Sequence, residues 1–165
     1  MKTKIYSVFP ACGKTWLYEH QKDYGLKILD SDSSQFSWVY TNIDENGDVI
    51  RGVRMVRNPE FPANYIKYIK ENICKYDYIF VSSHASVRKA LDEEDIDFVI
   101  VYPDMSCKAE WVGRCFIRDK TGESGCGADA VYDNWESWIL ECVETGINHE
   151  EIVLQSREHL SDRLI

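Results

Sequence analysis

The sequence predicts an α/β protein built on a doubly wound, parallel five-stranded sheet with helices on both faces. Apolar strand segments alternate with amphipathic helical segments along the chain. The segments 76–83 and 97–103 are nearly continuous apolar runs rather than apolar at every second residue, which is typical of a parallel sheet covered on both faces. A chain of 165 residues fits one domain, so we expect a single domain over residues 1–165.

Five short apolar runs are the predicted strands. Each is bounded by turn residues and is rich in Val, Ile, Tyr and Phe, the composition of a buried strand. None approaches the roughly 20 residues of a membrane span, and we expect a soluble, cytoplasmic protein. The runs lie at residues 4–9, 26–30, 76–83, 97–103 and 150–155.

Helical patterns fall between these strands. Apolar residues recur there with the spacing of one helix face, and charged residues occupy the rest. In the last helical segment Asp133 is a candidate N-cap, and Gly146 is the expected stop. The helices are expected from near Lys14 and at 62–73, 86–96, 105–120 and 133–146.

Two stretches interrupt the alternation. An insert at about 33–60 carries an Asn46-Gly47 pair between β-branched and aromatic runs, which predicts a β-hairpin. The outer edge of such a hairpin is a candidate homodimer contact through strand pairing. Residues 119–129 hold three glycines among small polar residues, and we expect a mobile loop there.

Charge and cysteine content exclude several classes of protein. The formal net charge is −9 with no basic run longer than two residues, which disfavours a nucleic-acid partner but allows a small phosphorylated ligand. The six cysteines contain no Cys-x-x-Cys pair, so a zinc ribbon is not expected. In an intracellular protein we expect them to be free thiols.

The segment "VFPACGKT", residues 8–15, matches the phosphate-binding consensus G-x-x-x-x-G-K-[ST] except at Val8. In such a loop backbone N–H groups surround a phosphate at a helix start, the lysine reaches the outer phosphates and the hydroxyl ligates magnesium. The alternative is a chance turn in which Lys14 and Thr15 are merely solvated. The position between the first strand and a helix favours phosphate binding. The candidate nucleotide-binding residues are Pro10, Ala11, Cys12, Gly13, Lys14 and Thr15.

Two carboxylates follow the second strand in "LDSDSS". Asp30 and Asp32 are two residues apart, so in an extended segment they project to the same side. Beside the loop they are candidates to hold Mg²⁺, together with Thr15, or to accept a proton from an acceptor hydroxyl. The alternative is that Asp30 caps a turn and Asp32 is solvated.

These motifs resemble those of the P-loop nucleoside and nucleotide kinase superfamily with the adenylate-kinase type of core. More narrowly, the chain is similar to small P-loop kinases of phages and prophages. The resemblance implies a kinase-type sheet, ATP as donor, Mg²⁺ as cofactor, and a glycine-rich lid at about 114–132. It spans nearly the whole chain, through "FPACGKT", "ILDSDSSQFSW", "RNPEFPANYI", "VSSHASVRKAL" and "VYPDMSCKAEWVGR".

The resemblance also implies roles for residues outside the loop. Arg114 and Arg118 lie on one helix face before the glycine-rich loop, where lid arginines stabilise the transferred charge; the alternative is surface pairs with Glu110 or Asp119. The third strand ends in Ser-Ser-His where many relatives have an aspartate, so magnesium would depend on Thr15, on phosphate oxygens, and on Asp30 or Asp32. The candidate acceptor-binding residues are Phe36, Arg57, Asn58, His84 and Arg88, each also explained by packing or solvation.

The expected function is Mg-ATP-dependent phosphoryl transfer to a small acceptor, a (deoxy)nucleoside monophosphate or a nucleoside, with Lys14 at the donor phosphates. Two alternatives stay open. One is a nucleotide-binding switch or slow NTPase, which the absence of the first loop glycine favours. The other is a polynucleotide end kinase, which the negative net charge disfavours.

Overall fold

The structure is a computed structural model that describes residues 2–39, 44–46, 56–121 and 126–165. Five strands form one sheet in the spatial order β2–β5–β1–β6–β7, and every neighbouring pair is parallel. The predicted parallel five-stranded sheet is therefore confirmed. The strands are β1 (Lys4–Val8), β2 (Ile28–Asp30), β5 (Tyr78–Ser82), β6 (Val99–Pro103) and β7 (Glu150–Leu154).

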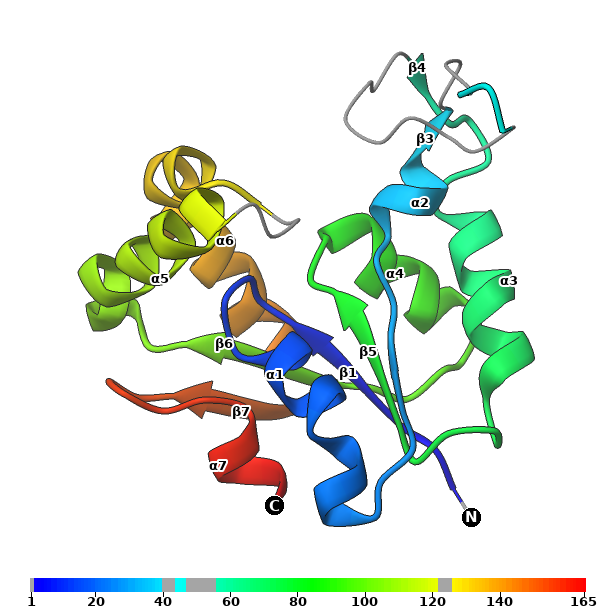
Figure 1. Cartoon of the computed structure of the whole chain (residues 1–165), viewed down its shortest axis with the longest axis horizontal. Coiled ribbons are helices and arrows are strands. Elements are labelled where there is room, and N and C mark those ends of the chain that lie inside the picture. The colour runs from blue at the N-terminus through cyan, green and yellow to red at the C-terminus, as the bar shows by residue number, and fades with distance from the viewer. Residues whose placement is uncertain (1, 40–43, 47–55, 122–125) are drawn as a thin grey trace.

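Helices lie on both sides of the sheet (Figure 1). In that view α1 and α7 lie in front of the sheet, α4 and α6 lie behind it, α3 packs beside α4, and α5 packs on α6. The helices are α1 (Lys14–Glu19), α3 (Ala63–Asn72), α4 (Ala85–Glu93), α5 (Lys108–Thr121), α6 (Ala128–Gly146) and α7 (Ser161–Leu164), with 3₁₀ turns η1 (Gln21–Tyr24) and η2 (Met105–Cys107).

The core lies between the central strands and the covering helices. The middle residues of β5 and β6 are almost fully buried, as are Trp111 of α5 and Trp135 of α6. The Trp135 ring meets Phe9 edge-on at 5.7 Å, and its indole N–H donates to the Met105 carbonyl at 3.0 Å. Burial on both faces explains why β5 and β6 are almost entirely apolar.

The predicted start of the last helix is wrong. α6 begins at Ala128, because the Asp119 carboxylate accepts the Ala128 N–H at 2.8 Å and so caps the helix from another segment. Asp133 is therefore inside the helix, whereas the predicted end at Gly146 is confirmed. α5 runs to Thr121, so the first part of the predicted loop is helical; residues 122–125 lie outside the described residues.

The insert contains the predicted antiparallel pair. Strands β3 (Trp38–Val39) and β4 (Val56–Arg57) pair in antiparallel register, and a short helix α2 (Ser34–Ser37) that we did not predict precedes them. The predicted turn includes Gly47, which lies outside the described residues. All six cysteines are free, and no helix in the described part of the chain is long and apolar enough to cross a membrane.

Candidate functional site

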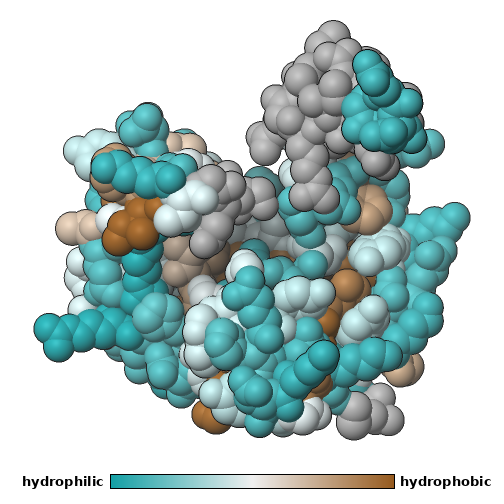
Figure 2. Space-filling model, viewed as in Figure 1, coloured by the Kyte–Doolittle hydropathy of each residue, from teal (hydrophilic) through white to brown (hydrophobic). Residues whose placement is uncertain are grey.

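Several of the predicted site residues lie where the strand order of the sheet reverses, between β1 and β5. β1 continues into α1 on one face, whereas its neighbour β5 continues into α4 on the other. In open parallel sheets such a point leaves a crevice at the carboxyl ends of the strands, and ligands bind there. The space-filling view shows the surface hollowed on this side, between α5 and α2 (Figure 2).

Val8 is a strand residue rather than a turn residue. It is 1% exposed, and the next residue, Phe9, still donates its N–H to Val101 of β6 at 2.8 Å. The turn therefore comes later, with positive φ angles at Ala11 (59°) and Gly13 (97°). Because the conformation that favours glycine falls on these two residues, this loop has no need of a glycine at position 8.

Two carbonyl groups of the loop are bound by neighbouring segments of the protein. The Cys12 carbonyl accepts a hydrogen bond from the Leu160 N–H at 2.8 Å, and the Ala11 carbonyl accepts one from Arg114 at 3.5 Å. Among the described residues, no acceptor is present for the N–H groups of residues 11–15. Since α1 has only six residues, these amide groups, rather than a long helix dipole, supply the positive potential.

Lys14, Thr15 and Asp30 lie together beside the loop. Partial burial raises the pKa of the Asp30 carboxyl, and the nearby charge of Asp32 raises it further. The positive charge of Lys14 and a hydrogen bond with Thr15 lower the same pKa, but burial has the largest effect. The Asp32 carboxylate accepts hydrogen bonds from the Ser34 N–H at 2.9 Å and the Ser34 hydroxyl at 2.7 Å. Asp32 is thus a turn-capping residue, and Asp30 is the carboxylate next to the lysine and the threonine.

His84 lies among three cations. Partial burial lowers its pKa, and the positive charges of Arg57, Arg88 and Lys14 lower it further. Its side chain is nevertheless exposed, so it lies at the surface of a concave region. Arg57 is exposed and stacks on the Trp38 ring at 4.4 Å. His84 is therefore within electrostatic range of both Arg57 and the loop lysine.

Arg88 is buried and is held by contacts within the protein. It is 3% exposed, and its guanidinium donates to the Thr145 hydroxyl at 3.0 Å and to the Ser83 carbonyl. Glu141 lies 3.7 Å from the same guanidinium. These contacts join α4 to α6 and leave Arg88 little capacity to bind a substrate.

Phe36 and Asn58 are also held by neighbours. The Phe36 ring packs against Tyr65 and Tyr68, with centroids 5.1 and 5.0 Å apart. The Asn58 side-chain oxygen accepts the Glu60 N–H at 3.0 Å. The geometry favours the packing alternative for Phe36 and a turn role for Asn58.

The two candidate lid arginines have protein partners. Arg114 contacts Glu110 at 2.5 Å and stacks on the Trp111 ring at 3.9 Å, which is the surface-pair alternative. Arg118 donates to the Cys126 carbonyl, while its Nε, which is buried, has no partner in the described part of the chain. The Arg118 guanidinium is therefore only partly paired within the described residues, whereas Arg114 is held by protein contacts.

Sequence reasoning missed a group of hydroxyls beneath the site. The Tyr65 hydroxyl donates to the Ser31 carbonyl at 3.2 Å. The hydroxyls of Ser31 and Ser82 lie near enough to affect the Tyr65 pKa, which burial raises to about 12, yet neither makes a hydrogen bond of normal geometry within the described residues. No sequence motif marks these residues, because they come together only when β2 and β5 pair.

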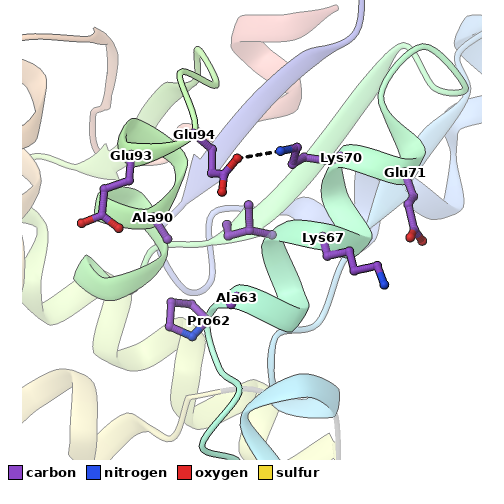
Figure 3. Close-up of a pocket in the computed structure, with 9 residues that line it drawn as sticks. Pro62, Ala63, Lys67, Lys70, Glu71, Ala90, Glu93 and Glu94 are labelled. Atoms are coloured by element: carbon purple, nitrogen blue, oxygen red, sulfur yellow. Dashed lines mark hydrogen bonds and ion pairs between the residues drawn. The ribbon is translucent and has the colours of Figure 1, made fainter.

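A separate groove lies away from these residues. It occupies about 550 Å³ between α3 and α4, with Lys70 and Glu94 paired across it at 2.6 Å (Figure 3). Its floor contains Ile66 and Ala90, and none of the predicted site residues lines it. The loop, rather than this groove, carries the residues capable of phosphate chemistry.

Comparison with known proteins assigns no family. No protein-family model matches the chain, and no curated protein matches it.

Proposed function

We propose that the chain is a kinase that uses Mg-ATP to phosphorylate a small acceptor, most simply a (deoxy)nucleoside monophosphate or a nucleoside. One observation carries the proposal. The loop at residues 11–15 leaves its N–H groups without a protein acceptor among the described residues, and it brings Lys14 and Thr15 beside Asp30. Free amides in a positive-φ loop favour an oxyanion, and the lysine adds the charge that a polyphosphate needs.

Asp30 has the environment of a proton acceptor. In the transfer, the acceptor oxygen bonds to the γ-phosphorus, the bond from that phosphorus to the β–γ bridging oxygen breaks, and ADP leaves with Lys14 beside its new charge. The acceptor hydroxyl loses its proton, and Asp30 is the carboxylate placed near the loop to take it. Burial raises the Asp30 pKa, which makes this carboxylate a stronger base than an exposed one.

The residues present fit a magnesium ion. Thr15 and Asp30 supply the hard oxygen ligands that Mg²⁺ prefers, and the ion usually needs only one or two protein ligands besides phosphate oxygens and water. The described residues contain no group of three or more His, Cys, Asp or Glu side chains arranged for a metal. When bound, the ion would neutralise phosphate charge; Thr15 would hold it, and Asp30 would either hold it through water or take the acceptor proton.

Arg57 favours an acceptor with its own negative charge. Its guanidinium stacks on Trp38 and has no acidic partner among the described residues, and it lies close enough to lower the pKa of His84. A free guanidinium beside a phosphate site is suited to bind a second phosphate through two parallel hydrogen bonds. This supports a nucleoside monophosphate over an uncharged nucleoside.

A second candidate function is a nucleotide-binding switch or slow NTPase. Two observations favour it: Arg114 is bound to Glu110, and β5 ends at Ser82 without an acidic residue. Both reduce the charge available to stabilise the transferred phosphoryl group. Such a protein would bind ATP without an acceptor-dependent reaction.

A coupled assay of ADP release tests the proposal. Mg-ATP is supplied with a panel of nucleosides, deoxynucleosides and their monophosphates, and Lys14→Ala is compared with Lys22→Ala, an exposed lysine on η1. We expect ADP release that depends on one acceptor class and falls at least about 100-fold in Lys14→Ala alone. ATP binding without acceptor-dependent release would favour the switch. Full activity of Lys14→Ala would refute the role of Lys14 and, with it, the assignment of this loop as the ATP site.

A further inference from the structure

The back of the phosphate loop rests on a segment that follows β7. We call residues 156–160 the C-terminal turn. Leu160 is fully buried, and its N–H donates to the Cys12 carbonyl at 2.8 Å. A Cβ placed on Gly13 would lie 3.4 Å from the Cβ of His159, so loop and turn are in van der Waals contact.

Arg114 joins this turn to the loop. One guanidinium nitrogen donates to the Glu158 carbonyl at 3.0 Å and to the Ala11 carbonyl at 3.5 Å. The other donates to Glu110 at 2.5 Å, and the guanidinium plane lies over the Trp111 ring at 3.9 Å. The side chain is therefore fixed by Glu110, Trp111 and Glu158, and the nitrogen that binds Glu158 also reaches the loop carbonyl.

Glu110 fixes the same assembly from the other end. Its carboxylate accepts hydrogen bonds from the Ser156 hydroxyl at 2.8 Å and from the Arg157 N–H at 2.9 Å, besides the bond from Arg114. Arg157 has a positive φ of 67°, a conformation that needs such support in a residue other than glycine. Glu110 thus holds both the turn and the arginine that reaches the loop.

These contacts determine where two loop N–H groups point. In a planar trans peptide the C=O and the following N–H point in opposite directions. Because the Ala11 carbonyl faces Arg114, the Cys12 N–H faces away from α5. Because the Cys12 carbonyl faces Leu160, the Gly13 N–H faces away from the C-terminal turn. Both belong to the N–H groups that find no acceptor among the described residues.

We propose that Arg114 is a positioning residue that, with Glu110 and the Leu160 N–H, holds the Cys12 and Gly13 N–H groups in a phosphate-binding orientation before any ligand arrives. This inference rests on the proposed function for the identity of the anion. It assigns Arg114 a role different from the one that its resemblance to a lid arginine implies. Preorganisation of this kind raises affinity by removing the cost of ordering the loop upon binding.

The test compares Arg114→Gln and Arg114→Lys with Lys108→Gln. Lys108 is on the same helix and pairs with Glu136 at 2.9 Å, so it controls for the loss of a cation from α5. Backbone amide NMR of the ligand-free protein should show shifts at Cys12 and Gly13 in both Arg114 variants and none in the control. Affinity for Mg-ATP should fall about tenfold in Arg114→Gln. Lysine should restore little of it, because a single ammonium cannot contact Glu110, Glu158 and Ala11 together.

Two results would overturn the inference. One is an unchanged pair of Cys12 and Gly13 amide resonances in the variants. The other is recovery of wild-type affinity in Arg114→Lys, which would mean that the charge acts directly on the phosphate. If Arg114→Gln does not fold, the Cys12 and Gly13 amide resonances of Arg114→Lys show whether the inference holds. If the wild type binds no Mg-ATP, the proposed function fails, while the ligand-free spectra still test the orientation of the loop.

Discussion

Replacing Gly13 by alanine tests whether the loop conformation is required for phosphate binding. Gly13 has φ 97° and ψ 21°, which side-chain-bearing residues rarely adopt. Holding alanine there costs about 2 kcal/mol of backbone strain. The new Cβ would meet its nearest neighbour, His159, at 3.4 Å, so steric overlap adds little.

The expected net loss of stability is small. The lower unfolded-state entropy of alanine returns about 0.4–1 kcal/mol, which leaves a loss of about 1 kcal/mol in the free energy of unfolding. For a chain of this length that corresponds to a fall in Tm of about 2–4 °C. Relief of the strain would rotate the adjoining peptide groups, and the affinity for Mg-ATP should therefore fall at least about tenfold.

Gly25→Ala is the matched control. Gly25 also has a positive φ of 65°, but it ends η1 before β2, and a Cβ there would have no neighbour within 4 Å. Thermal unfolding followed by circular dichroism, with and without Mg-ATP, should show ligand-induced stabilisation that is lost in Gly13→Ala and kept in Gly25→Ala. Wild-type ATP affinity in Gly13→Ala, or an equal loss in both variants, would refute the reasoning.

Three further predictions address the strand, the carboxylate and the arginines. Val8→Gly removes a buried side chain from a strand, so urea denaturation should show that the free energy of unfolding falls by about 3 kcal/mol, with no gain in ATP affinity. A gain in ATP affinity would contradict the assignment of Val8 to the strand rather than to the turn. Burial raises the pKa of Asp30 in the folded state. Ionisation of this carboxyl therefore destabilises the folded state as the pH rises above about 4, the pKa of the carboxyl in the unfolded chain. Asp30→Asn should therefore have a higher Tm than the wild type at pH 7, with no difference below about pH 4, and should lose phosphotransfer. Arg88→Ala should lower the free energy of unfolding by about 3 kcal/mol, because Arg88 is buried and hydrogen-bonded. Arg57→Ala should change that free energy by less than about 0.5 kcal/mol and should raise KM for the acceptor. Equal stabilities of the two variants would contradict these assignments.

The strands and the position of the loop were predictable because their signals are local. Apolar runs such as 97–103 are sufficient to identify a covered parallel strand, and Gly13 with Lys14 directly after β1 identifies the turn at its end. The consensus could not show why Val8 is tolerated. That answer depends on the pairing of Phe9 with β6, which extends β1 by one residue.

The roles of charged residues were less predictable, because their partners are distant in sequence. Arg114 binds the carbonyl of Glu158, 44 residues away, and Arg88 binds Thr145, 57 residues away. Asp119 of α5 caps α6, so that helix begins at Ala128 rather than at the local candidate Asp133. Local patterns identify residues capable of chemistry, while only the fold shows which of them have already been used to hold the structure together.

Isothermal titration of Mg-ATP into the wild type and Lys14→Ala tests the central claim most directly. The free N–H groups of residues 11–15 and the adjacent Lys14 and Thr15 predict saturable one-to-one binding to the wild type. Loss of the lysine should weaken that binding at least about tenfold. Absence of binding to the wild type, or equal binding to both proteins, would contradict the assignment of this loop as a nucleotide site.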